Sequence, residues 1–219
     1  MGIILKENAL ILDDNDATER NAKEQEYLDY INTHIGNVRK AFMMYIAPLV
    51  KCNHISDLIS DEELKKAIAM VYQRLDQHDA SKFSDSEFDG YRAKWYPTER
   101  EKNYDQDFLN TMEDRYEEAW KHHYQNNPHH PKHWLDPVTG VPRDMSLDAI
   151  IEMICDIASF SLTQGSSTLE WWENDAEDEK KCLSPKSKQI IEDLLYNVIF
   201  NTQENQTNEP EETTGTEEV

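Results

Sequence analysis

Hydrophobic positions recur three or four residues apart along most of the chain, which is the period of an amphipathic α-helix. The clearest run covers residues 22–49, where one face carries Tyr27, Ile31, His34, Ile35, Val38, Phe42 and Tyr45. Pro48 lies near the end of this run, and a proline in that position stops a regular helix. The pattern therefore predicts a helix over most of residues 22–49.

Capping signals predict two further helices. The spacing of a capping box occurs twice, at Ser60 with Glu63 and at Ser84 with Glu87. In a capping box the serine side chain accepts from the backbone amide of the glutamate, and the glutamate side chain accepts from the backbone amide of the serine. Apolar periodicity predicts three more helices, over about residues 104–124, 146–162 and 185–200. We predict an all-α fold, a single bundle of about six helices over residues 22–201.

The two ends of the sequence lack this pattern. Residues 1–21 predict an irregular lead-in, with three aspartates close together. Residues 202–219 contain six glutamates and no basic residue, a composition that predicts a disordered acidic tail. Trp171 and Trp172 are adjacent within an acidic stretch, and we interpret them as part of an interface.

The formal net charge of −22 limits the partners that the protein can bind. Such a charge repels phosphate backbones and anionic lipids, so we expect no long nucleic acid and no membrane as partner. An acidic surface leaves room for a protein partner. Three widely spaced cysteines predict reduced thiols, and residues 1–12 make a poor signal peptide, so we expect a cytoplasmic protein.

Histidines and aspartates stand where an apolar face is expected. All eight histidines lie between positions 34 and 133, and five of them fall within twelve residues. His34 and Asp156 each lie on the apolar side of a predicted helix, and His78-Asp79 lies where a helix ends. A buried carboxylate is costly unless it is paired or metal-bound, and imidazole with carboxylate suits Mn, Fe, Co, Ni or Zn. A shared metal ion accounts for all four residues.

The order of these residues resembles the HD-domain superfamily of metal-dependent phosphohydrolases. His34, His78-Asp79 and Asp156 follow its ligand order, and Lys82 matches its frequent HDxxK form. The strings HDASKF and AWKHHYQNNPHHPKHW are similar to an uncharacterised bacterial and phage family marked by HDxSKF and HHxxNxHHPxHW. The resemblance spans about residues 30–160, and a phage-encoded copy would act in the host cytoplasm.

The resemblance implies a ligand set of one or two divalent ions. His34, His78, Asp79 and Asp156 would hold one metal. His123 with either His129 or His130 would bring a second, bridged by Asp79, although crowding of these histidines in one segment departs from the common two-metal pattern. Lys82 would neutralise developing charge, and His122 or His133 would protonate the leaving oxygen.

The sequence therefore predicts hydrolysis of a phosphomonoester or phosphodiester, a nucleotide or a related small molecule. Two alternatives stay open. One is an HD-type di-iron oxygenase, because some two-metal members activate oxygen. The other is a noncatalytic acidic interaction protein of phage type, in which the histidine site has only a structural role.

Overall fold

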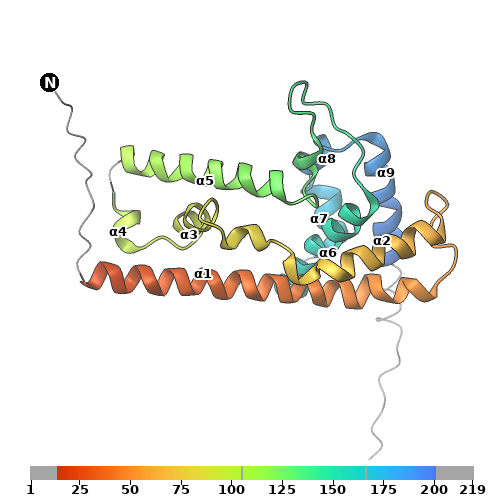
Figure 1. The fold of residues 1–219 in the computed structure, drawn as a ribbon, viewed down its shortest axis with the longest axis horizontal. Helices are drawn as coiled ribbons and strands as arrows, with labels where there is room; N and C mark the ends of the chain where they lie inside the picture. The colour runs from red at the N-terminus through yellow and green to blue at the C-terminus, as the bar shows by residue number, and fades with distance from the viewer. Residues whose placement is uncertain (1–13, 105, 166, 201–219) are drawn as a thin grey trace, which may run out of the picture. The chain divides into compact units, whose positions relative to one another are not determined.

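The computed structural model describes residues 14–104, 106–165 and 167–200, and its regular structure there is helical (Figure 1). One isolated β-bridge joins Leu135 to Pro142. The prediction of an all-α fold is confirmed. The α-helices in the described residues are α1 (Asp14–Ala41), α2 (Asp61–Arg74), α3 (Phe88–Trp95), α4 (Glu99–Lys102), α5 (Gln106–Asn126), α6 (Leu147–Gln164), α7 (Thr168–Asn174), α8 (Glu177–Lys181) and α9 (Pro185–Leu194).

Short turns of other helical types connect or extend these helices. A π-helical turn and then a 3₁₀ turn containing Pro48 follow α1, and a second π-helical turn follows α9. Each breaks the hydrogen-bond register of the helix that it extends. In chain order these segments are Phe42–Ile46, Ala47–Lys51, Leu75–Gln77, Ala80–Phe83, Pro131–Trp134 and Leu195–Phe200.

Helix boundaries differ from the sequence prediction at several points, and regular α-helix ends at Ala41 in α1 and at Leu194 in α9, earlier than predicted. The irregular lead-in predicted for residues 1–21 is wrong over residues 14–21, because α1 already begins at Asp14. Residues 1–13 and the predicted acidic tail, 202–219, lie outside the described residues. The capping box at Ser60 and Glu63 is confirmed, with both of its hydrogen bonds present. The box predicted at Ser84 and Glu87 is wrong, because α3 begins only at Phe88 and the Glu87 side chain bonds elsewhere.

The chain divides into two compact units, which are described separately. Unit 1 contains residues 14–33 and Asp79–His123, and unit 2 contains His34–His78 and residues 124–200. The single domain predicted over residues 22–201 covers both units.

Unit 2 holds an extensive aliphatic core. α2 packs against α6, and α6 also contacts α7 and α9. α6 is buried around much of its circumference, and Ile150, Ile151 and Ile154 are fully enclosed. Trp172 of α7 is 1% exposed and belongs to this core. The interpretation of Trp172 as an interface residue is therefore wrong, because its position in α7 turns the indole inward.

Unit 1 is held by aromatic rings and a buried arginine. Tyr27 of α1 packs against Phe88, Tyr91 and Tyr96, with ring centroids 5.1 to 6.5 Å apart. Arg92 of α3 is fully buried, and its guanidinium donates to both carboxylate oxygens of Glu101 at 2.5 and 2.7 Å. This bidentate pair compensates the cost of burying the arginine charge.

Within unit 1, α3 crosses α5 at Gly90. A Cβ at this position would lie 2.7 Å from the Ala119 Cβ and 2.8 Å from the Arg115 carbonyl oxygen. We expect Gly90→Ala to destabilise the protein by about 1–2 kcal/mol, because the strain of overpacking exceeds the gain in helix propensity. The matched control is Gly36→Ala in α1, where nothing lies within 4 Å and the propensity gain should add about 0.5–1 kcal/mol. Denaturant unfolding measures both, and equal effects would contradict the close crossing.

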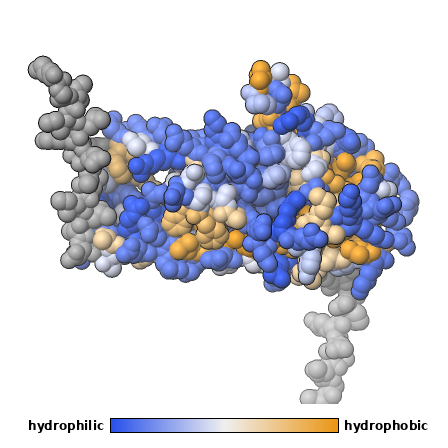
Figure 2. All heavy atoms as spheres, viewed as in Figure 1, coloured by the Kyte–Doolittle hydropathy of each residue, from blue (hydrophilic) through white to orange (hydrophobic). Residues whose placement is uncertain are grey.

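The face of the molecule seen in Figure 2 is mostly polar, with small scattered apolar areas. Among the helices of the described residues, none has both the length and the apolar character that a bilayer crossing requires.

Candidate metal centre

Three elements of unit 2 bring the predicted ligands together. His34 of α1 shares a buried face with Ile31 and Val38, so it enters the interior with the apolar side chains. The 3₁₀ turn that follows α2 ends at His78, which is 1% exposed. Asp156 comes from the interior-facing side of α6, and its side chain is 16% exposed.

The ligand triad, His34, His78 and Asp156, is compact. The His34 Nε2 lies 3.1 Å from Asp156 Oδ1 and 3.4 Å from His78 Nε2, and the His78 Nε2 lies 3.7 Å from the same carboxylate oxygen. Ligand atoms held about 2.0–2.2 Å from one ion lie roughly 3–3.6 Å apart. Two of the separations in the triad lie within this range and the third, 3.7 Å, is slightly longer, so these groups are positioned to hold a metal ion after a small adjustment.

Hydrogen bonds on the far side of each ring set the tautomers. The His78 Nδ1 lies 3.1 Å from Glu152 Oε1, an acceptor, so the proton of the neutral ring belongs on Nδ1. The Ser159 hydroxyl donates to the Asp156 carbonyl at 2.7 Å, so its oxygen can accept from His34 Nδ1 at 3.5 Å. Both Nε2 lone pairs then face the carboxylate. This is how a carboxylate or hydroxyl orients histidines that bind a metal.

The Asp156 carboxylate fits a cation better than it fits the side chains alone. Its Oδ1 lies 3.1 Å from His34 Nε2 and accepts no hydrogen bond from the described residues while that ring carries its proton on Nδ1. Burial opposes ionisation of Asp156, but hydrogen bonds and positive charge from His34 and His78, which require an added proton on Nε2, outweigh burial and hold the pKa of the carboxyl well below its usual range. An ionised oxygen beside two imidazole lone pairs is stable only with a positive charge among them, either a metal ion or an added proton.

Glu152 and His129 extend the triad within unit 2. One Glu152 oxygen, Oε1, lies 3.1 Å from His78 Nδ1 and 3.5 Å from His129 Nδ1. The other, Oε2, accepts from Arg74 Nε at 2.8 Å. The imidazole of His129 lies on that of His78 with centroids 4.4 Å apart, and its Nε2 is 3.8 Å from Asp156 Oδ2. Burial opposes ionisation of Glu152, but the two histidines keep its pKa below the usual range.

Unit 1 carries a second polar cluster, which begins at Asp79. This residue has φ of +55°, a left-handed conformation that aspartate adopts more readily than most residues. Its Oδ2 accepts from Lys82 Nζ at 2.6 Å, and its Oδ1 lies 3.3 Å from His123 Nε2. Lys82 and His123 therefore both contact Asp79. The resemblance named these three residues as parts of one site, and their roles there stay predictions.

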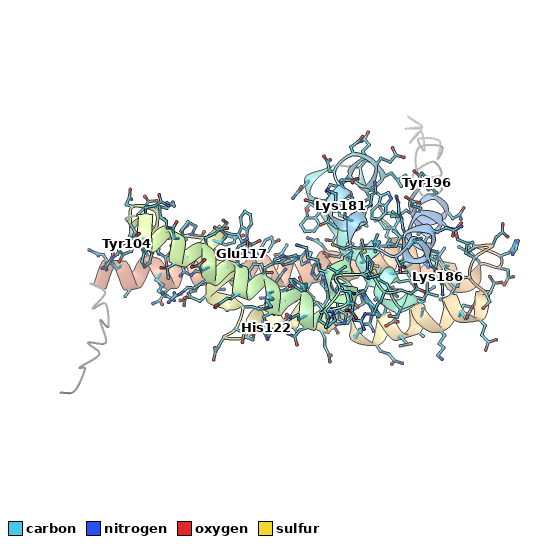
Figure 3. The ribbon with its side chains drawn as sticks, turned by 90° about the horizontal axis from the view of Figure 1, so that it is seen from above. Tyr104, Glu117, His122, Lys181, Lys186 and Tyr196 are labelled. Atoms are coloured by element: carbon cyan, nitrogen blue, oxygen red, sulfur yellow. The ribbon has the colours of Figure 1, made fainter. Side chains whose placement is uncertain are left out.

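Glu87 joins two histidines of α5 in the same cluster. Its carboxylate is fully buried and accepts from His122 Nδ1 at 2.6 Å and from His123 Nδ1 at 2.8 Å. His123 is buried, whereas the His122 side chain is 39% exposed on the α5 surface (Figure 3). Adjacent histidines on one helix thus share one carboxylate but meet different surroundings.

The remaining predicted residues lie in the segment after α5. The ring of His130 lies on that of His129, with centroids 4.3 Å apart. The His133 Nδ1 donates to the Tyr124 carbonyl at 3.2 Å, which gives this ring a structural hydrogen bond. The roles of His130 as ligand and of His133 as acid stay predictions. Because His78 and Asp79 belong to different units, their joint role in one site also stays a prediction.

Two carboxylates, Glu152 and Glu87, stand outside the predicted site residues although both bond its histidines. Glu152 lies one helical turn before Asp156 on the same face of α6, so the spacing itself was a usable signal. Glu87 was read as a helix cap and, without a supporting pattern, as a partner of the metal ligands. The fold shows that its carboxylate accepts from two α5 histidines.

A protein-family model matches residues 23–197, and its description is a family of unknown function, DUF5662. Neither a curated protein nor a solved structure matches the chain. The match covers both units and every candidate ligand.

Proposed function

We propose that this chain, which belongs to the DUF5662 family, is a metal-dependent phosphohydrolase acting on a small phosphomonoester or phosphodiester such as a nucleotide. The observation that carries the proposal is the triad of His34, His78 and Asp156, with three ligand atoms 3.1 to 3.7 Å apart. The resemblance of HDASK to the HDxxK form supplies the reaction class, because a metal site by itself does not specify a reaction.

The donor set favours a first-row transition metal. Two imidazoles and one carboxylate suit Mn, Fe, Co, Ni or Zn better than Mg or Ca, which prefer oxygen ligands. Such an ion, when bound, supplies Lewis acidity toward a phosphoryl oxygen and lowers the pKa of a bound water. The proposal includes one ion at the triad, and a second with Asp79 and His123 as the resemblance implies.

The chain's own residues would bind and neutralise the substrate. Lys82 keeps its ammonium group beside Asp79 and is only 12% exposed, so its charge is held in a partly desolvated place. An exchange of this contact for a phosphoryl oxygen would stabilise developing negative charge. His122 has its Nδ1 on Glu87 and a partly exposed ring, which suits delivery of a proton to a leaving oxygen.

The acidic character of the chain limits the substrate class. With a net charge of −22, a long polyanion is repelled over the whole surface, whereas a small ester meets mainly the local field of the site. Small phosphate esters in the cytoplasm are therefore the proposed substrates.

The test is turnover of phosphate esters by the full-length, untagged protein loaded in turn with Mn²⁺, Fe²⁺, Co²⁺, Ni²⁺ or Zn²⁺. Substrates are p-nitrophenyl phosphate, its bis-ester and a nucleotide panel. We expect turnover with at least one metal and a loss of at least about 100-fold in His78→Ala, because a ligand is removed and the loss of a ligand's partner alone costs about 10- to 100-fold. The matched control is His54→Ala, whose side chain is 83% exposed in a loop and should leave the rate unchanged.

Equal rates in His78→Ala and the native protein would contradict the proposal. Metal binding without turnover of any ester, but with consumption of oxygen by an iron form, would favour the oxygenase instead.

A further inference from the structure

Glu152 occupies an unusual position, because one buried carboxylate meets three nitrogen donors from two other segments. Its side chain is 7% exposed. Oε2 accepts from Arg74 Nε, while Oε1 faces the Nδ1 atoms of His78 and His129. Arg74 is itself anchored by Asp148, which lies one turn earlier on α6 and accepts from Arg74 Nη1 at 2.6 Å.

This arrangement fixes which nitrogen of each imidazole carries the proton. A carboxylate oxygen can only accept, so a neutral histidine that faces it must carry its proton on Nδ1. His78 then offers the Nε2 lone pair to the triad, and His129 offers its Nε2 toward Asp156 Oδ2, 3.8 Å away. The arginine fixes the orientation of the carboxylate, because its Nε donates to Glu152 Oε2 while its Nη1 donates to Asp148.

We infer that Glu152, held by Arg74, is the positioning residue that sets the tautomers of His78 and His129, so that both present Nε2 to a cation at Asp156. His129 becomes a further ligand by this device. The inference rests on the metal site of the proposed function and not on the reaction. Glu87 bonds the Nδ1 atoms of His122 and His123 in unit 1, so the same device occurs twice in this chain.

The geometry also permits a competing role for Glu152. Its carboxylate, with the Nδ1 atoms of His78 and His129, forms a group compact enough to hold an ion directly. An ion there would need Nδ1 of His78 as a lone-pair donor, whereas the triad needs Nε2. The contact with Arg74 favours the positioning role, because a guanidinium 2.8 Å from the carboxylate repels a metal cation.

Glu152→Gln separates the two roles. Arg74 still requires an acceptor, so the amide oxygen of Gln is drawn to it and the NH₂ group turns toward the histidines. An amide NH₂ can only donate, so at least one of His78 and His129 must switch its proton to Nε2. In the metal-free protein the added proton of the triad belongs on His34, whose Nε2 is nearer to Asp156 Oδ1 than the Nε2 of His78 is. We expect two-bond ¹H–¹⁵N spectra of the metal-free, full-length protein to show neutral Nδ1–H rings for His78 and His129 in the native chain, and an Nε2–H ring for at least one of these two in the variant.

Metal binding provides the second readout. Titration with Co²⁺, followed by its visible absorption, should give an affinity about 10- to 100-fold weaker in Glu152→Gln at unchanged stoichiometry, because partners of ligating histidines carry effects of that size. Glu152→Asp keeps a carboxylate and should retain the native tautomers. The matched control is Asp148→Asn, which removes the charge of the other carboxylate bound by Arg74 on the same helix and leaves an amide oxygen to accept from it. Asp148 is not one of the groups that face His78 or His129, so we expect native tautomers and nearly native Co²⁺ affinity.

Unchanged tautomers in Glu152→Gln would overturn the inference, and so would an equal loss of affinity in Asp148→Asn. Loss of all Co²⁺ binding with native tautomers would identify Glu152 as a ligand and also overturn it. The tautomers are measured in the metal-free protein and do not depend on turnover. A protein that hydrolyses none of the esters would therefore contradict the proposed reaction without contradicting this inference.

Discussion

Asp156→Asn is expected to weaken metal binding by more than about 100-fold, because changes to the partners of ligands already cost about 10- to 100-fold. The carboxylate supplies the only formal negative charge of the ligand triad, and an amide replaces it with a neutral group. Isothermal titration with Co²⁺ or Zn²⁺ measures the change directly.

The same substitution should lower the stability of the metal-free protein at neutral pH. His34 and His78 hold the pKa of the Asp156 carboxyl well below its usual range, so the ionised carboxylate stabilises the folded state at any pH above its unfolded pKa. The amide of asparagine carries no charge and loses this contribution. Denaturant unfolding of both metal-free proteins measures the difference.

Asp148→Asn is the matched control, because it makes the same chemical change on the same helix. Its carboxylate bonds Arg74 and lies outside the triad, so we expect lower stability with metal affinity retained. A native-like affinity in Asp156→Asn, or an equal loss in both variants, would contradict the assignment of Asp156 as a ligand.

Bound metal is expected to raise the thermal midpoint of the protein substantially. The triad joins α1, the end of α2 and α6, so an ion there stabilises only the folded arrangement of unit 2. At a free concentration 1,000 times the dissociation constant, linkage gives about 4 kcal/mol. For a chain of this size that corresponds to roughly 8–16 °C.

Calorimetry of the full-length protein with and without Zn²⁺ measures this shift, and excess chelator should reverse it. Asp156→Asn, with metal bound more than about 100-fold more weakly, should gain less than about 1.4 kcal/mol over the same concentrations, about a third of the native effect. A native protein whose midpoint does not respond to any of the five metals would contradict a specific folded-state site.

The helices and the triad were predictable because both depend on local pattern. Apolar residues at helical spacing mark the faces of α2 and α6 that are buried, and a histidine or aspartate on such a face must have a compensating partner in the interior. His34 and Asp156 were found in this way, 122 positions apart in sequence and 3.1 Å apart in space.

The start of α1 was not predictable from apolar periodicity. Residues 14–21 are mostly polar, and that part of the helix depends on helix propensity and on ion pairs such as Arg20 with Asp89. Glu87 was misread for a related reason. The capping-box spacing is a local signal. In the folded unit the Glu87 carboxylate instead accepts hydrogen bonds from two histidines of α5, which lie 35 and 36 residues later in the sequence.

The network of Arg74, Glu152 and His129 shows where local pattern stops being informative. A glutamate one turn from Asp156 could be recognised as facing inward, but not as the acceptor of two imidazoles and one guanidinium. Those contacts depend on where α2 and the segment after α5 pack against α6. The sequence could therefore name candidate ligands, but the tautomers of the histidines follow only from the tertiary structure.

Elemental metal analysis of the untagged, full-length protein tests the central claim most directly, with the native chain and Asp156→Asn analysed side by side after removal of loosely bound ions. We predict about one or two equivalents of a transition metal in the native protein and a small fraction of that in the variant. No metal in the native protein, even after reconstitution with Mn²⁺, Fe²⁺, Co²⁺, Ni²⁺ and Zn²⁺, would contradict the metal centre and leave an acidic interaction protein as the better account.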